Sequence, residues 1–158
     1  MSALEPVFVH GWACGPEIWQ PLQAALGGQA YHNLDLGYFT PSPTEKSVVA
    51  AAEFLAHQNG QPKLFICHSL GLLWVLSRCT LPEGSRVVGI NAFGRFAAAQ
   101  DFTQGVPLRV LGRMQAGIAR NVAQGVNTFR ARCGVPDVAP QACNEATLHA
   151  GVRVFSTG

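Results

Sequence analysis

The residues best suited to chemistry lie in the segment His68-Ser69-Leu70-Gly71. An apolar run at residues 64–67 precedes the serine and predicts a buried strand, whereas the residues after it have the apolar spacing of a helix. A serine held in a sharp turn between a strand and a helix is the arrangement of a nucleophile elbow, whose hydroxyl projects from the edge of the sheet. Ser69 is therefore the candidate nucleophile, and an ordinary helix start with a capping serine is the alternative.

The spacing around Ser69 follows the elbow pattern Gly-x-Ser-x-Gly with one departure. Small residues are needed two positions before and two positions after the serine, because the strand and the helix nearly touch there. Gly71 satisfies the second position, but Cys67 occupies the first. A thiol side chain is compact, so we expect an elbow in which Cys67 replaces the first glycine.

Two main-chain N–H groups are needed to stabilise the oxyanion that forms when such a serine attacks a carbonyl carbon. One donor is expected from Leu70, the residue after the nucleophile. The other is expected from the loop His10-Gly11-Trp12, which follows an apolar run at residues 7–9. Both segments follow strands of one predicted parallel sheet, and ligands bind at the carboxyl ends of such strands.

The elements that must position this serine alternate as strand and helix over residues 1–92. This alternation predicts an α/β fold with a parallel sheet of about four strands and helices on both faces. A capping-box pattern at residues 42–45 predicts the beginning of the second helix. The expected strands lie at residues 7–9, 30–36, 64–67 and 86–90, and the expected helices at residues 15–26, 48–57 and 70–79.

After this region the alternation stops, and two helices follow each other without a strand between them. Leu111, Met114 and Ile118 share one face of a helix expected at residues 107–120, and a second helix is expected at residues 121–133. These helices predict a lid placed over the sheet. The expected organisation is a core at residues 1–92, a helical lid at residues 93–150 and the beginning of a return to the core at residues 151–158.

The composition is that of a globular chain rather than of a disordered or membrane-spanning one. Apolar residues make up 48% of the 158 residues and charged ones only 13%, and no apolar run is long enough to cross a bilayer. The start of the sequence lacks the order of a signal peptide, and five irregularly spaced cysteines favour reduced thiols. We therefore expect a cytoplasmic protein, and nothing in the sequence indicates a cofactor or a metal site.

The net charge of +2 conceals a strongly basic segment. Residues 93–133 carry six arginines and one acidic residue, Asp101, whereas the rest of the chain is net negative. The chain has two lysines and no run of basic residues, which argues against a nucleic-acid-binding protein. The local excess of arginine needs another explanation.

Three segments, at residues 9–19, 67–71 and 105–114, resemble the α/β-hydrolase family. More narrowly, they resemble the esterases that cleave the methyl ester of pimeloyl-[acyl-carrier-protein] in biotin synthesis, and the similarity includes the helical lid. The resemblance implies a serine carboxylesterase that works without a cofactor. A generic short-chain ester is the second substrate that it allows.

The same resemblance implies roles for four residues of this chain. Ser69 is the expected nucleophile, and Trp12 and Leu70 are the expected donors of the oxyanion hole. Trp12 and Phe129 are expected to line the pocket for the acyl chain. The expected reaction forms an acyl-enzyme on Ser69 and releases it to water.

The resemblance also gives the basic segment a use. On a helix, Arg109, Arg113 and Arg120 fall within roughly 40° of one another and form one stripe. Acyl carrier proteins are acidic, and such a stripe can steer and orient an acidic partner. The alternative is a solvated helix face without a partner.

A serine hydrolase also needs an acid and a base, which the family supplies after the lid in the order Ser, Asp, His. The resemblance implies that residues 144–153 close the lid and lead back to the sheet, so the strands that bear the acid and the base are expected beyond residue 158. The possible substitutes are His10, His68, His149, Asp101 and Asp137, whereas His32 and His57 are expected to have ordinary structural roles. None of them is assigned as the base or the acid.

We therefore expect this sequence to be the front part of a longer hydrolase. Loss of triad members lowers kcat by about 10⁴ to 10⁶, so the chain alone is expected to be a weak esterase or an acyl-binding remnant. Residues 86–90 are expected to form an unpaired sheet edge with exposed apolar side chains, which favours self-association.

Overall fold

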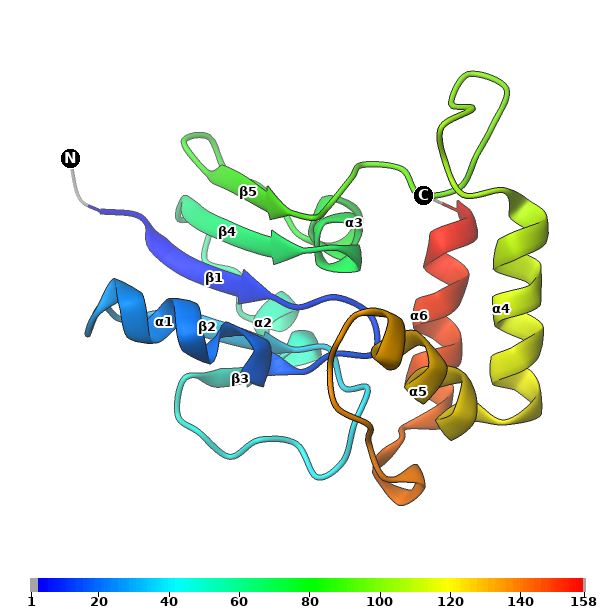
Figure 1. Ribbon diagram of the computed structural model, residues 1–158. Helices are drawn as coiled ribbons and strands as arrows, with labels where there is room; N and C mark the ends of the chain where they lie inside the picture. Colours follow the sequence, from blue (N-terminus) through cyan, green and yellow to red (C-terminus); the bar gives the residue numbers. More distant parts are fainter. Residues whose placement is uncertain (1–2, 158) are drawn as a thin grey trace.

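A parallel five-stranded sheet lies at the centre of the computed structural model, which describes residues 3–157 (Figure 1). The strand order is β3-β2-β1-β4-β5, and every neighbouring pair is parallel. Helices cover both faces of the sheet, so the predicted α/β architecture is confirmed, with one strand more than expected. The strands are β1 (Glu5–Val9), β2 (His32–Asp35), β3 (Val48–Ala50), β4 (Lys63–His68) and β5 (Arg86–Ile90).

Apolar side chains on both faces of the central strands hold the helices. Phe8 and Ile66 pack with Trp19 on one face, and Phe65 packs with Phe54 on the other. Consecutive residues of a strand point to opposite faces, so Phe65 and Ile66 contact different helices. One face is covered by η1 (Pro16–Trp19) and α1 (Gln20–Leu26), and the other by α2 (Ala51–Ala56) and α3 (Leu70–Arg78).

The helix predicted at residues 48–57 is wrong at its beginning. The first part of this range forms β3, which pairs with β2 in the register Leu34↔Val49, and α2 begins only at Ala51. The capping-box pattern at residues 42–45 does not begin a helix. Two consecutive valines suit a strand, and pairing with the edge of β2 supplies hydrogen bonds that a local pattern does not reveal.

Within residues 3–157, three long helices pack beyond the carboxyl ends of the strands, where the arrowheads in Figure 1 point. The first two confirm the helices predicted at residues 107–120 and 121–133. The third runs without a break across the expected boundary at residue 150 and packs against the first. No helix in the described part of the chain combines the length and the apolar character needed to cross a bilayer. The elements of this region are α4 (Leu108–Arg120), α5 (Val122–Arg132), η2 (Pro140–Ala142) and α6 (Glu145–Thr157).

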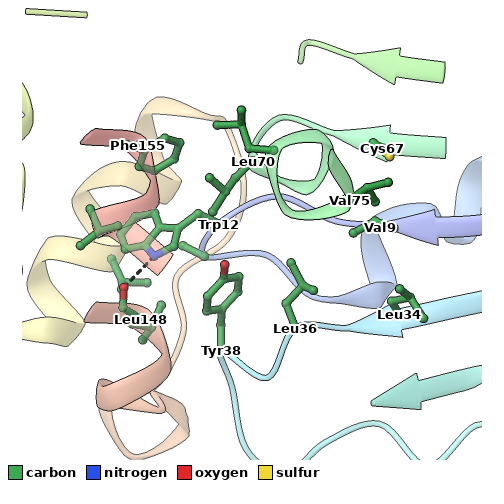
Figure 2. Close-up of a cluster of buried hydrophobic side chains, with 14 of the residues drawn as sticks. Val9, Trp12, Leu34, Leu36, Tyr38, Cys67, Leu70, Val75, Leu148 and Phe155 are labelled. Atoms are coloured by element: carbon green, nitrogen blue, oxygen red, sulfur yellow. Dashed lines mark hydrogen bonds between the residues drawn. The ribbon is translucent and has the colours of Figure 1, made fainter. Parts of the chain in front are cut away.

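The core is continuous from the sheet to these helices and centres on Trp12, which is only 1% exposed. Figure 2 shows the Trp12 indole near Leu70, Tyr38 and Phe155. A Cβ at Gly151 would lie 2.6 Å from the Trp12 ring and 2.8 Å from the Tyr38 ring, so glycine lets α6 approach closely. In this way α6 closes the core over the carboxyl ends of the strands.

β5 forms an exposed edge of the sheet. All of its residues are exposed, and Val87, Val88 and Ile90 retain 38%, 46% and 39% of their accessible surface. The expected edge at residues 86–90 is therefore confirmed. Apolar side chains at an edge strand favour pairing with another chain.

Candidate active site

Ser69 lies at the sharp turn between β4 and α3. Its backbone has a φ of 50° and a ψ of −121°, a positive-φ conformation that is strained for a residue with a side chain. Its N–H donates a hydrogen bond of 3.1 Å to the main-chain oxygen of Ile90, which ties the turn to the end of β5. The serine is half-buried, and its side chain makes no capping hydrogen bond to α3. The serine is thus not an ordinary helix cap, and the strained turn has the shape that a nucleophile elbow requires.

The two positions flanking the turn show why small residues are needed. A Cβ at Gly71 would lie 2.4 Å from the main-chain oxygen of Val9 and 2.8 Å from that of His10, so only glycine fits between α3 and the end of β1. Cys67 is fully buried in the core, and desolvation by burial raises the pKa of its thiol to about 12. The thiol is therefore protonated and unreactive at neutral pH, and it serves as a small packed side chain.

The loop after β1 lies directly against the serine. A Cβ at Gly11 would lie 3.1 Å from the Ser69 Cβ and 3.0 Å from Nδ1 of His68. The main-chain N–H groups of Trp12 and Leu70 donate to no protein acceptor within residues 3–157. Two unpaired donors beside a strained serine are what an oxyanion hole supplies to a developing negative charge.

His10 is fully buried and holds this loop in place through hydrogen bonds to the main chain. Its Nδ1 lies 2.9 Å from the main-chain oxygen of Gly11, and its Nε2 accepts a hydrogen bond of 3.0 Å from the Leu36 N–H. Because Nε2 accepts, the ring hydrogen sits on Nδ1 and is donated to Gly11. Both ring nitrogens are thereby engaged by the main chain, so His10 positions the loop and has no free nitrogen to act as the base.

Arg130, on α5, holds the same loop in place. Its Nη1 donates a hydrogen bond of 2.6 Å to the main-chain oxygen of Ala13, and its Nε donates one of 2.6 Å to that of Pro136. Ala13 has a positive φ of 55°, which is uncommon for alanine and needs external support. In the sequence, Arg130 is noticeable only as one of the arginines of the basic segment. Arg130 follows the buried Val126 by four residues, so it lies on the buried face of α5. This spacing is the one feature of the sequence that indicates a buried arginine.

Trp12 and Phe129, the expected lining of the acyl pocket, are brought together. Their ring centroids lie 5.0 Å apart at an interplanar angle of 74°. The Trp12 Nε1 donates a hydrogen bond of 2.9 Å to the main-chain oxygen of Leu148, which holds the indole under α6 (Figure 2). Phe129 is partly buried and also lines a groove between α4 and α5.

The three arginines of the predicted stripe are all exposed on α4. Arg113 and Arg120 line the groove between α4 and α5, together with Arg132 of α5. Arg109 does not line that groove. The stripe therefore borders a hollow on one side and faces solvent along the rest of its length.

The possible substitutes for the base and the acid do not complete a triad. No hydrogen bond joins the Ser69 hydroxyl to a histidine in the part of the chain that the structure describes. Desolvation by burial, with a smaller contribution from the nearby His10, lowers the pKa of His68. Asp101 forms a salt bridge of 3.1 Å with Arg95, and His149 lines a hollow between α4 and α6.

Comparison with known families agrees with this geometry. Residues 7–154 match the sequence profile of the alpha/beta hydrolase family, and the chain belongs to that family. The matched region includes the β1 loop, the Ser69 turn, α4, α5 and most of α6. No curated protein matches the sequence. Membership places the chain in a class of proteins that are generally hydrolytic enzymes.

Proposed function

We propose that this chain carries the nucleophile half of a serine carboxylesterase active site that acts on an acyl ester. The observation that carries the proposal is the strained backbone of Ser69 beside the Gly11-Trp12 loop. Strain at a polar residue between a strand and a helix is common where a fold holds a reacting group in place.

In the proposed reaction, the Ser69 Oγ attacks the ester carbonyl carbon while its proton passes to a base. The oxyanion that forms accepts hydrogen bonds from the N–H groups of Trp12 and Leu70. The tetrahedral intermediate then expels the alcohol, which takes up a proton, and leaves an acyl group on Ser69. Water cleaves that ester, which releases the carboxylic acid and restores the serine.

A base hydrogen-bonded to Ser69 is not among residues 3–157, so we expect slow turnover from this chain alone. Removing triad members costs about 10⁴ to 10⁶ in kcat and leaves the contribution of the oxyanion hole and of binding. This observation favours a second candidate function, in which the chain is an acyl-binding remnant that keeps the pocket without turnover.

For the substrate we propose the methyl ester of a pimeloyl chain carried on an acidic carrier protein, in biotin synthesis in the cytoplasm. Support comes from the packed pair Trp12 and Phe129, which offers an apolar surface, and from the exposed arginines Arg109, Arg113 and Arg120. An acidic partner would be attracted to this stripe and oriented by it. A generic short-chain ester is the second proposed substrate.

A fluorophosphonate probe tests the nucleophile. We expect the native chain to be labelled and Ser69→Ala to remain unlabelled. Ser77→Ala, which removes an exposed serine from the same helix, is the matched control and should label like the native chain. Absence of labelling in the folded native protein would favour the acyl-binding remnant.

A binding measurement with an acyl carrier protein tests the partner. We expect the double variant Arg113→Glu/Arg120→Glu to bind the carrier about tenfold more weakly or worse, because two favourable charges become repulsive. Arg153→Glu, an exposed arginine on α6, is the control and should change little. Unchanged affinity in the double variant would remove the carrier protein from the proposal.

A further inference from the structure

We propose that the groove between α4 and α5, here called the lid groove, binds a single-chain amphiphile with an anionic head group. The chemical class is an alkyl chain that ends in a phosphate or a carboxylate. This inference does not require Ser69 to be a nucleophile, because the binding site lies on the lid itself.

The lid groove lies beside a close contact between the two helices. A Cβ at Gly125 would lie 2.8 Å from Cγ1 of Ile118 and 3.2 Å from its Cα, so glycine lets the helices meet there. At Gly117, by contrast, an added Cβ would meet nothing within 4 Å. The hollow has a volume of about 680 Å³, which falls in the usual range for small-molecule pockets.

The floor of the lid groove is apolar. Ile118 is 1% exposed and Phe129 is partly buried, and both line the groove beside Met114 and Val110. Val110 keeps 44% of its surface exposed, so the groove presents an uncovered apolar strip. An alkyl chain laid on this strip would remove apolar surface from water on both partners.

The rim of the lid groove is positively charged and uncompensated. Arg113, Arg120 and Arg132 line it, and no acidic residue does. α4 and α5 contain no aspartate or glutamate, and none of these three arginines forms a salt bridge within residues 3–157. Guanidinium groups bind phosphate and carboxylate through paired N–H donors, so the rim fits an anionic head group.

The concave floor distinguishes this ligand from the acidic carrier surface proposed above. A flat protein surface can meet the exposed stripe, which includes Arg109, whereas an alkyl chain can also follow the apolar lining of the groove. The two uses also differ in their arginines, since Arg132 belongs only to the groove and Arg109 only to the stripe.

Calorimetric titration of the whole chain with octyl phosphate, kept below its micellar concentration, tests the proposal. We expect octyl phosphate to bind at least about tenfold more tightly than inorganic phosphate or octyl glucoside, because only it satisfies both the rim and the floor. Equal affinity for inorganic phosphate would reduce the site to surface arginines and overturn the proposal. Binding to anionic vesicles without binding of monomeric octyl phosphate would also overturn it.

Two pairs of variants locate the site. Arg113→Gln/Arg132→Gln should weaken octyl phosphate binding about tenfold or more, while Arg109→Gln should not. Gly117→Leu should block the hollow with all arginines intact, whereas Gly112→Leu, on the same helix outside the groove, should bind normally. Leucine has a higher helix propensity than glycine, so both variants should fold, which circular dichroism checks. Undiminished binding by Gly117→Leu would contradict the assignment.

Discussion

The guanidinium of Arg130 joins α5 to the loop that carries the proposed oxyanion donor, through a hydrogen bond of 2.6 Å from Nη1 to the main-chain oxygen of Ala13. The two residues are 117 positions apart in the sequence. Arg130 is 8% exposed, and its Cζ also lies 5.6 Å from the ring centroid of Phe39. A single buried charge thus sets the position of the loop relative to α5.

Arg130→Met should lower the free energy of unfolding by about 2 to 4 kcal/mol, because two main-chain oxygens lose a charged donor in a buried place. Urea denaturation measures the change. Arg132→Met, two residues along the same helix and exposed, should change stability by less than about 0.5 kcal/mol. Equal effects of the two substitutions would show that the buried contact contributes nothing.

Gly71→Ala should destabilise the fold by about 2 to 4 kcal/mol, because the added methyl group would overlap the Val9 carbonyl at 2.4 Å. Gly112→Ala is the control, since nothing lies within 4 Å of its added Cβ and alanine favours a helix. Urea midpoints should therefore move in opposite directions. A Gly71→Ala protein as stable as the native one would mean that α3 and β1 are not in close contact.

Protonation of Glu5 at low pH should lower the free energy of unfolding. A hydrogen bond from Lys63, 2.7 Å away, and the nearby His32, 3.0 Å away, lower the pKa of Glu5 below its ordinary value of 4.5. The stability that ionised Glu5 contributes is fully present at pH values above 4.5. It is lost as the pH falls through the lower pKa that Glu5 has in the folded state.

The measurement is the urea midpoint between about pH 6 and about pH 3. Glu5→Gln should lose less stability over this interval than the native chain. Glu83→Gln removes an exposed carboxylate from the loop before β5 and should behave like the native chain. If Glu5→Gln and the native chain lose stability equally, the ion pairs with Lys63 and His32 do not contribute.

We propose that the exposed edge at β5 allows two copies of the chain to associate. Val88→Lys should reduce self-association in sedimentation velocity experiments over a range of protein concentration, because a charge on an edge strand opposes pairing. Leu26→Lys changes a comparably exposed apolar residue at the end of α1 and should leave association unchanged. A chain that stays monomeric at high concentration would refute the proposal.

Much of the fold is predictable because its signals are local. The apolar runs at residues 64–67 and 86–90 correspond to β4 and β5, and the apolar spacing of Leu111 and Ile118 corresponds to the buried face of α4. β3 was missed because its residues become a strand by pairing with β2, and that pairing is not visible in a local pattern.

Part of the candidate site could likewise be predicted from the sequence, and part could not. The proximity of Ser69 to the Gly11-Trp12 loop follows from the rule that parallel strands end at one edge of a sheet, so it could be predicted. The contacts that hold the loop in place could not be predicted, because the residues that form them are distant in sequence. Trp12 bonds to Leu148, 136 positions away, and His10 to Leu36, 26 positions away.

The most direct test of the central claim is the rate at which a fluorophosphonate modifies Ser69, followed by mass spectrometry of the peptide that contains it. If the fold activates this serine, the folded chain should react at least about a hundredfold faster than the same chain unfolded in urea, with the adduct on Ser69. Equal rates in the two states, or an adduct on another serine of the folded chain, would contradict the account.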